Sequence, residues 1–143
     1  MLRSFRYLLF PFSLIYGAGV WLRNKLFDKD ILKSSSFNFP LICVGNLAAG
    51  GTGKTPMTEY LVRLLKNDFK TATLSRGYKR KTVGFAIANE NTTALEIGDE
   101  PMQFHQKFPD VVVAVGEERL VAIPQLLHER PGTQVIILDD AFQ

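Results

Sequence analysis

A glycine-rich segment that ends in lysine and threonine is the stretch of this sequence best suited to phosphate chemistry. It follows the apolar run Pro40 to Val44 and leads into a helical pattern. Glycines let consecutive backbone N–H groups converge on an anion at a helix N-terminus, where the helix dipole also favours negative charge. The pattern predicts that Lys54 reaches the β/γ-phosphates of a nucleotide and that the Thr55 hydroxyl ligates Mg²⁺. The predicted nucleotide-binding residues are Gly50, Gly51, Thr52, Gly53, Lys54 and Thr55.

This loop departs from the strict pattern G-x-x-x-x-G-K-[ST] at one position. Ala48 stands where the first glycine should fall, so Gly50, Gly51 and Gly53 must form the turn. The alternative interpretation is a glycine-rich turn from strand to helix with a solvated lysine. The apolar strand before the loop and the helix after it favour phosphate binding.

Two acidic residues directly follow the last apolar run of the chain. Asp139 and Asp140 follow the predicted strand Gln134 to Leu138 directly. A buried strand ending in carboxylates is the Walker B arrangement, in which one acid holds Mg²⁺ directly or through water. The predicted metal-binding residues are therefore Thr55, Asp139 and Asp140, and the sequence does not choose between the two acids.

Two further positions are candidates for a catalytic role. Arg76 lies in a basic loop after the predicted strand Lys70 to Leu74, and ligands bind at the carboxyl ends of strands in open α/β sheets. The alternative there is an exposed basic turn. Asp99 opens a helix, where its carboxylate could deprotonate a hydroxyl or simply serve as the N-cap.

The order of strands and helices predicts an α/β fold, a P-loop NTPase-like parallel sheet flanked by helices. The domain begins near Phe39, after a polar serine-rich linker at 33–38, and covers residues 39–143. Residues 89–96 are interpreted as a loop. The predicted strands are 40–44, 70–74, 83–88, 110–115 and 134–138, and the predicted helices are 56–67, 98–107 and 117–129, the last bent at Pro124.

Composition narrows the class of protein. Hydrophobic residues make up 46% and charged residues 22% of the 143, which suits one globular domain and excludes a disordered chain. Cys43 is the single cysteine, so no intrachain disulfide forms and a reducing compartment is expected. The net charge of +3 hides two basic blocks, at 1–33 and 63–81, and an acidic segment at 82–143. Such blocks serve anionic partners or are solvated surfaces, and we predict no nucleic-acid partner.

The N-terminal 33 residues predict a helix at a membrane surface. Leu8 to Leu22 is almost uncharged, but it is shorter than the roughly 20 apolar residues of a membrane span and contains Pro11. A signal peptide would export an ATP-binding loop to a compartment without ATP. An interfacial helix explains the aromatic residues and the flanking arginines and lysines, while a buried core helix remains the alternative.

Four ordered motifs carry a family resemblance. They are Gly45-Asn46 with Gly50 to Pro56, then Leu74-Ser75-Arg76-Gly77-Tyr78, then Gly98-Asp99-Glu100-Pro101, then Asp139-Asp140-x-Phe142-Gln143. In this order the sequence resembles the tetraacyldisaccharide 4'-kinases, which are the lipid A 4'-kinases of Gram-negative bacteria. The match covers essentially the whole chain, including the basic and aromatic N-terminus.

The resemblance implies transfer of the γ-phosphoryl group of ATP to the 4'-hydroxyl of a tetraacyldisaccharide 1-phosphate. It also implies ATP and Mg²⁺ as cofactors and a peripheral location at the cytoplasmic face of the inner membrane, held by residues 1–27. By motif, Asp99 is the base, Lys54 and Thr55 bind phosphates and Mg²⁺, and Arg76 lies beside the reacting groups.

Two departures from the family qualify this interpretation. Ala141 replaces the usual glycine, and the second half of the family's sequence is absent, together with the histidine thought to partner the base. We therefore expect the chain to be the nucleotide-binding half of a larger enzyme, with little turnover alone. The alternatives are a membrane-associated partitioning ATPase, which would usually carry lysine where this chain has Ala49, and an inactive fragment.

Overall fold

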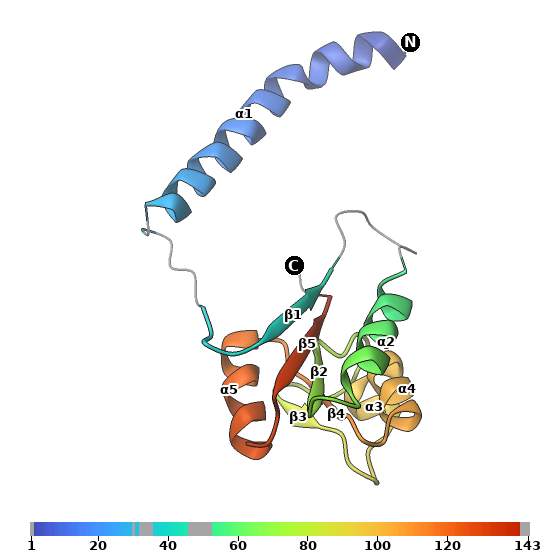
Figure 1. The fold of residues 1–143 in the computed structure, drawn as a ribbon. Coiled ribbons are helices and arrows are strands. Elements are labelled where there is room, and N and C mark those ends of the chain that lie inside the picture. Colours follow the sequence, from blue (N-terminus) through green and yellow to red (C-terminus); the bar gives the residue numbers. More distant parts are fainter. Residues whose placement is uncertain (1, 30, 32–35, 46–52, 141–143) are drawn as a thin grey trace. The chain divides into compact units, whose positions relative to one another are not determined.

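The computed structural model describes residues 2–29, 31, 36–45 and 53–140 (Figure 1). The chain forms two units, residues 1–36 and residues 37–143. The first contains helix α1 (Leu2–Asp28), and the second contains all the other elements. The predicted loop residues Gly50, Gly51 and Thr52 lie outside the described residues.

A five-stranded sheet organises the second unit. Its strands lie in the order β1 (Leu41–Val44), β5 (Val135–Asp139), β2 (Thr71–Ser75), β4 (Val112–Val115) and β3 (Ala86–Ile87) (Figure 1). The first four run parallel, and β3 pairs antiparallel with β4. The predicted α/β class with a parallel sheet is confirmed. Because parallel strands end at the same edge, the segments that follow β2 and β5 begin side by side.

Helices cover both faces of the sheet. Helices α2 (Lys54–Leu65) and α4 (Asp99–Lys107) pack on one face, where Val62 and Phe104 join the same buried cluster as Ile137. Helix α5 (Arg119–Glu129) packs on the other face, where Leu126 joins the cluster of Ile136 and Leu138. Successive side chains of a strand point to opposite faces. Asp139, two residues after Ile137, therefore points toward α2.

Most of the described apolar side chains of helix α1 are exposed. Phe10, Tyr16 and Trp21 are 61%, 76% and 61% exposed, and the helix runs through Pro11 without ending. Cations lie over two of its aromatic rings, with Lys25 Nζ 4.5 Å from the Trp21 ring centroid and Arg23 Cζ 5.4 Å from that of Phe27. Within the described residues, no helix is both long and apolar enough to cross a bilayer.

Two predicted segments of the sheet unit are corrected. The predicted strand 83–88 shortens to β3, because Gly84 takes a φ of 88° and its N–H bonds the Glu117 carboxylate instead of a neighbouring strand. The predicted loop 89–96 ends in a one-turn helix, α3 (Ala94–Ile97). Glu96 accepts hydrogen bonds from the backbone N–H of Thr93 at 2.7 Å and from its hydroxyl at 2.9 Å.

Candidate functional site

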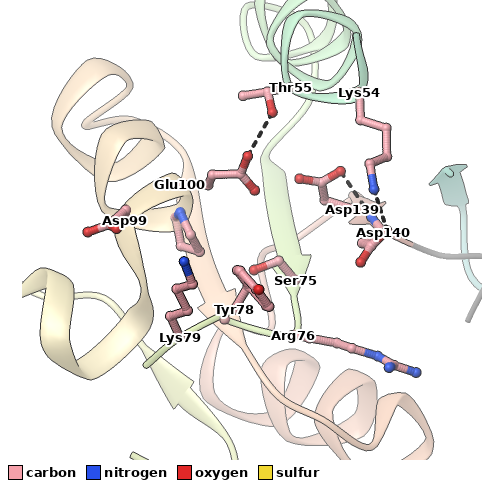
Figure 2. A pocket seen from close by; sticks show the side chains of 12 residues that line it. Lys54, Thr55, Ser75, Arg76, Tyr78, Lys79, Asp99, Glu100, Asp139 and Asp140 are labelled. Carbon is pink, nitrogen blue, oxygen red and sulfur yellow. Dashed lines mark hydrogen bonds and ion pairs between the residues drawn. The ribbon is translucent and has the colours of Figure 1, made fainter. Parts of the chain in front are cut away.

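A cavity of about 540 Å³ opens at the carboxyl ends of β2 and β5, beside the starts of α2 and α4 (Figure 2). This is the edge at which parallel α/β sheets bind ligands. The cavity gathers all the predicted catalytic and metal-binding residues. Its lining residues are Lys54, Thr55, Ser75, Arg76, Gly77, Tyr78, Lys79, Asp99, Glu100, Pro101, Asp139 and Asp140.

The start of α2 brings Lys54 and Thr55 to the cavity. Gly53 precedes the helix with a φ of 76°, a left-handed conformation that glycine adopts without strain. Lys54 Nζ donates a hydrogen bond of 2.6 Å to Asp140 Oδ1. This hydrogen bond raises the pKa of the Lys54 ammonium above its usual value, although burial acts in the opposite direction. The lysine is therefore held as a cation beside the end of β5.

The two acids at the end of β5 have different surroundings. Asp139 is buried, and its Oδ1 accepts hydrogen bonds from the Thr58 hydroxyl at 3.3 Å and from the Asp140 N–H at 3.0 Å. Burial raises the pKa of the Asp139 carboxyl. Asp140 is more exposed and pairs with Lys54. The structure thus gives the two acids different environments, a difference that the sequence alone did not reveal.

Helix α4 presents Asp99 and Glu100 from its first turn. Gly98, with a φ of 95°, occupies the N-cap position, and no side chain caps the helix. The alternative that Asp99 is the N-cap is therefore wrong, since Asp99 is the first helical residue and its side chain is exposed. Glu100 Oε1 accepts a hydrogen bond of 3.0 Å from the Thr55 hydroxyl and so links α4 to α2.

The loop after β2 forms the remaining wall. Tyr78 and Lys79 line the cavity, and Lys79 Nζ lies 5.3 Å from the Tyr78 ring centroid. Arg76 extends from the end of β2 away from Asp99 in Figure 2. Its charge adds to burial in lowering the pKa of Arg119, so the two guanidinium groups lie near each other.

Sequence reasoning missed three contributors to this site. Glu100 follows Asp99 in the first turn of a predicted helix, where the helix dipole stabilises acidic side chains. This position is the signal by which the sequence could have identified it. Thr58 lies three residues after Thr55, so both side chains lie on the same face of α2. That spacing could have identified Thr58 as a site residue. Arg119 donates to the backbone carbonyl of Asp140, a contact between distant segments for which the sequence holds no local signal.

The donor set fits Mg²⁺, which prefers oxygen ligands and keeps several waters. Hydroxyl and carboxylate oxygens of Thr55, Glu100 and Asp139 face the cavity. Ser75 Oγ is buried beside them and has no hydrogen-bond partner among the described residues, and a water of a hydrated cation would supply one. The described residues contain no cluster of three or more His, Cys, Asp or Glu side chains suited to a metal. Mg²⁺ is usually bound through one or two carboxylates together with substrate phosphates, and the oxygen atoms that line this cavity suit that arrangement.

Known proteins share sequence with this chain over almost its whole length. The family model described as tetraacyldisaccharide-1-P 4'-kinase (LpxK) matches residues 5–143. A Flavobacterium johnsoniae protein named tetraacyldisaccharide 4'-kinase is 60% identical over 138 residues, which are 96% of this chain and 41% of the relative. A Phocaeicola vulgatus protein of the same name is 61% identical over 137 residues, which are 94% of this chain and 37% of the relative.

A solved structure is also similar. The crystal structure of the "apo" form of LpxK from Aquifex aeolicus in complex with ATP matches with a TM-score of 0.79 and 42% identity. The match covers 100% of this chain and 45% of that chain. The present chain therefore spans less than half the length of each of these three relatives.

Proposed function

The chain belongs to the tetraacyldisaccharide-1-P 4'-kinase family, and from this premise we propose that it forms the nucleotide-binding part of a lipid kinase. The proposed reaction transfers the γ-phosphoryl group of ATP to the 4'-hydroxyl of a tetraacyldisaccharide 1-phosphate. One observation carries the proposal: a single cavity joins Lys54, Thr55 and the β5 acids to Asp99. A phosphate-binding half and a hydroxyl-deprotonating half are what phosphoryl transfer to an alcohol requires.

The first half of the cavity, which we name the nucleotide wall, consists of Lys54, Thr55, Asp139 and Asp140. Lys54 places its ammonium against the β/γ-phosphate oxygens, and Asp140 orients that ammonium before the nucleotide binds. Thr55 and Asp139 would hold Mg²⁺ directly or through water. When bound, Mg²⁺ neutralises charge on the β- and γ-phosphates.

The second half, which we name the acceptor wall, consists of Arg76, Tyr78, Lys79 and Asp99. Asp99 accepts the proton of the sugar hydroxyl as the hydroxyl oxygen attacks the phosphorus in line. Its exposed carboxylate is accessible to a bound acceptor. Arg76 stabilises charge that develops on the transferring group, and Glu100 connects the two walls through Thr55.

The N-terminal unit supports a peripheral membrane location for this reaction. Exposed aromatic side chains with basic residues beside them suit the headgroup region of a bilayer. We propose that residues 1–27 hold the enzyme at the cytoplasmic face of the inner membrane, where ATP and an acylated acceptor meet.

A phosphoryl-transfer assay tests this function. A full-length kinase of this family that contains this chain is mixed with γ-labelled ATP, Mg²⁺ and tetraacyldisaccharide 1-phosphate in detergent micelles. We expect label on the disaccharide, at the 4'-position by mass spectrometry. Hydrolysis of ATP without labelled lipid would instead support the ATPase alternative and reject the kinase.

A further inference from the structure

The side chain of Arg80 is buried under the loop that forms the acceptor wall. It is 3% exposed, although it carries a full charge. Its Nη2 donates hydrogen bonds of 2.5 Å to the Gly84 carbonyl and 2.5 Å to Glu117 Oε1. Its Nε is also buried, and no other atom in the part of the chain that the structure describes bonds to it. A guanidinium removed from water in this way is costly unless an opposite charge compensates it, so Glu117 is required for this arrangement.

Glu117 uses both of its carboxylate oxygens for the same loop. Oε1 accepts from Arg80, and Oε2 accepts from the Gly84 N–H at 3.0 Å. Glu117 lies two residues after the end of β4. The loop between β2 and β3 is therefore fastened at two points to a segment that the sheet itself positions.

The same loop packs against the start of α4 without space for a methyl group. A Cβ at Gly77 would lie 2.5 Å from Arg80 Cδ and 2.9 Å from the Ile97 carbonyl oxygen, and a Cβ at Gly98 would lie 3.0 Å from the Tyr78 carbonyl oxygen. Gly98 directly precedes Asp99. A continuous set of contacts therefore runs from Arg80 through the turn at Gly77 to the residue before Asp99.

Two more hydrogen bonds fasten the loop to α3, which leads into α4. The Lys81 N–H donates to the Leu95 carbonyl at 2.8 Å, and the Thr82 hydroxyl donates to the Glu96 carbonyl. The loop and the start of α4 thus form one packed piece. Arg80 and Glu117 join this piece to the sheet.

We propose that Arg80 and Glu117 are positioning residues for the acceptor, which hold Tyr78, Lys79 and Asp99 in place before substrate binds. This inference rests on the proposed kinase function. Neither side chain lines the 540 Å³ cavity, so both act through the loop and not by touching the substrate. The nucleotide wall has its own contacts, Lys54 with Asp140 and Asp139 with Thr58, and does not depend on this ion pair.

The test replaces Glu117 by glutamine in the full-length kinase, with Glu118→Gln as the matched control. Glutamine has no charge, and its NH₂ group replaces one of the two accepting oxygens, so a donor would face either Arg80 or the Gly84 N–H. Glu118 is an exposed neighbour that makes no side-chain cap to α5. We expect kcat/KM for the lipid acceptor to fall at least about tenfold in Glu117→Gln, because small misplacements of reacting groups are costly. The KM for ATP should stay within about twofold, and Glu118→Gln should match the unaltered enzyme.

Hydrogen exchange supplies a measurement that does not need activity. The backbone amides of Arg80, Lys81 and Gly84 should exchange at least about tenfold faster in Glu117→Gln, since loss of a charge-assisted bond lowers the local opening free energy. An enzyme without kinase activity would reject the proposed function, whereas unchanged exchange at these amides would reject the positioning role.

Two kinetic outcomes would also overturn the inference. One is a lowered thermal midpoint with unchanged acceptor kinetics, which would make the ion pair structural only. The other is an equal loss toward ATP and acceptor, which would indicate general loosening. If Glu117→Gln fails to fold, Arg80→Lys is measured in the same way, because it keeps the charge but loses the planar fork of donors.

Discussion

The two walls of the cavity are built in different ways. The nucleotide wall lies at the ends of regular elements, α2 and β5, and its side chains bond to one another, as Lys54 does to Asp140. The acceptor wall lies on an irregular loop and the first turn of α4, and its shape depends on close backbone packing at Gly77 and Gly98. A hydrogen bond from Thr55 to Glu100 links α2, which begins in the nucleotide wall, to α4, which begins in the acceptor wall. The difference suggests that nucleotide binding and acceptor phosphorylation can be disrupted separately.

The largest separate effect is expected at Asp99. Asp99→Asn keeps the size of the side chain but cannot accept the proton, so acceptor phosphorylation should fall about 10²-fold to 10⁴-fold. Stability should change little, because Gly98 and not Asp99 occupies the N-cap. Lipid phosphorylation and thermal midpoint are compared with Asp68→Asn, an exposed control. Near-normal phosphorylation by Asp99→Asn would contradict the catalytic role.

Lys54→Ala tests the opposite wall. Removing the cation should lower turnover on the order of a hundredfold, because a phosphate contact of several kcal/mol in the transition state is lost. The ion pair with Asp140 is partly exposed, so little of this loss should come from unfolding. Lys66→Ala, at the other end of α2, serves as the control. If the Lys54→Ala enzyme kept the turnover of the unaltered enzyme, the phosphate-binding role of Lys54 would be wrong.

Deletion of residues 1–27 sharpens the comparison, since it should weaken binding to lipid but not binding of ATP. Binding to vesicles that contain anionic phospholipid should fall about tenfold or more, because each basic residue near such a surface contributes about 1 kcal/mol. ATP binding should be retained, because Lys54 and the β5 acids belong to the other unit. Vesicle sedimentation and ATP titration measure the two effects. Unfolding of the truncated protein would favour the core-helix alternative.

The smallest effect is expected at Thr58, whose buried hydroxyl donates a hydrogen bond to Asp139 of the nucleotide wall. Thr58→Val removes the hydroxyl that donates to Asp139 and should cost about 1 kcal/mol of stability. Acceptor KM should be unchanged, because the Thr58 hydroxyl donates to Asp139, which belongs to the nucleotide wall. Thermal melting and steady-state kinetics check both points. The control is Thr71→Val, which removes a hydroxyl that donates to the Phe69 carbonyl at the start of β2, away from the cavity. A raised acceptor KM with unaltered ATP kinetics would contradict the division.

The same contrast explains which parts could be predicted from sequence. The glycines before Lys54-Thr55 and the apolar run before Asp139-Asp140 are local patterns with a direct structural meaning, and strand alternation places Asp139 toward α2. The helix at 94–97 is one turn long, too short for apolar periodicity, although the Thr93-x-x-Glu96 spacing is a helix-start signal.

The acceptor wall could not be derived in the same way. The bond between Thr55 and Glu100 spans 45 residues, and the pair of Arg80 and Glu117 spans 37. Such contacts follow from the register of β2 against β4 and β5, which no short pattern encodes. The alternative of an exposed basic turn after β2 would leave Arg80 in solvent, yet the fold buries the Arg80 side chain.

Titration of ATP into the full-length kinase by calorimetry tests the central claim, that one cavity has separable nucleotide and acceptor walls. Three proteins are compared in the presence of Mg²⁺: the unaltered enzyme, Lys54→Ala and Asp99→Asn. We predict that ATP affinity falls at least about tenfold in Lys54→Ala and stays within about twofold in Asp99→Asn. Equal losses of ATP affinity in the two variants, or retention of full affinity by Lys54→Ala, would contradict the account.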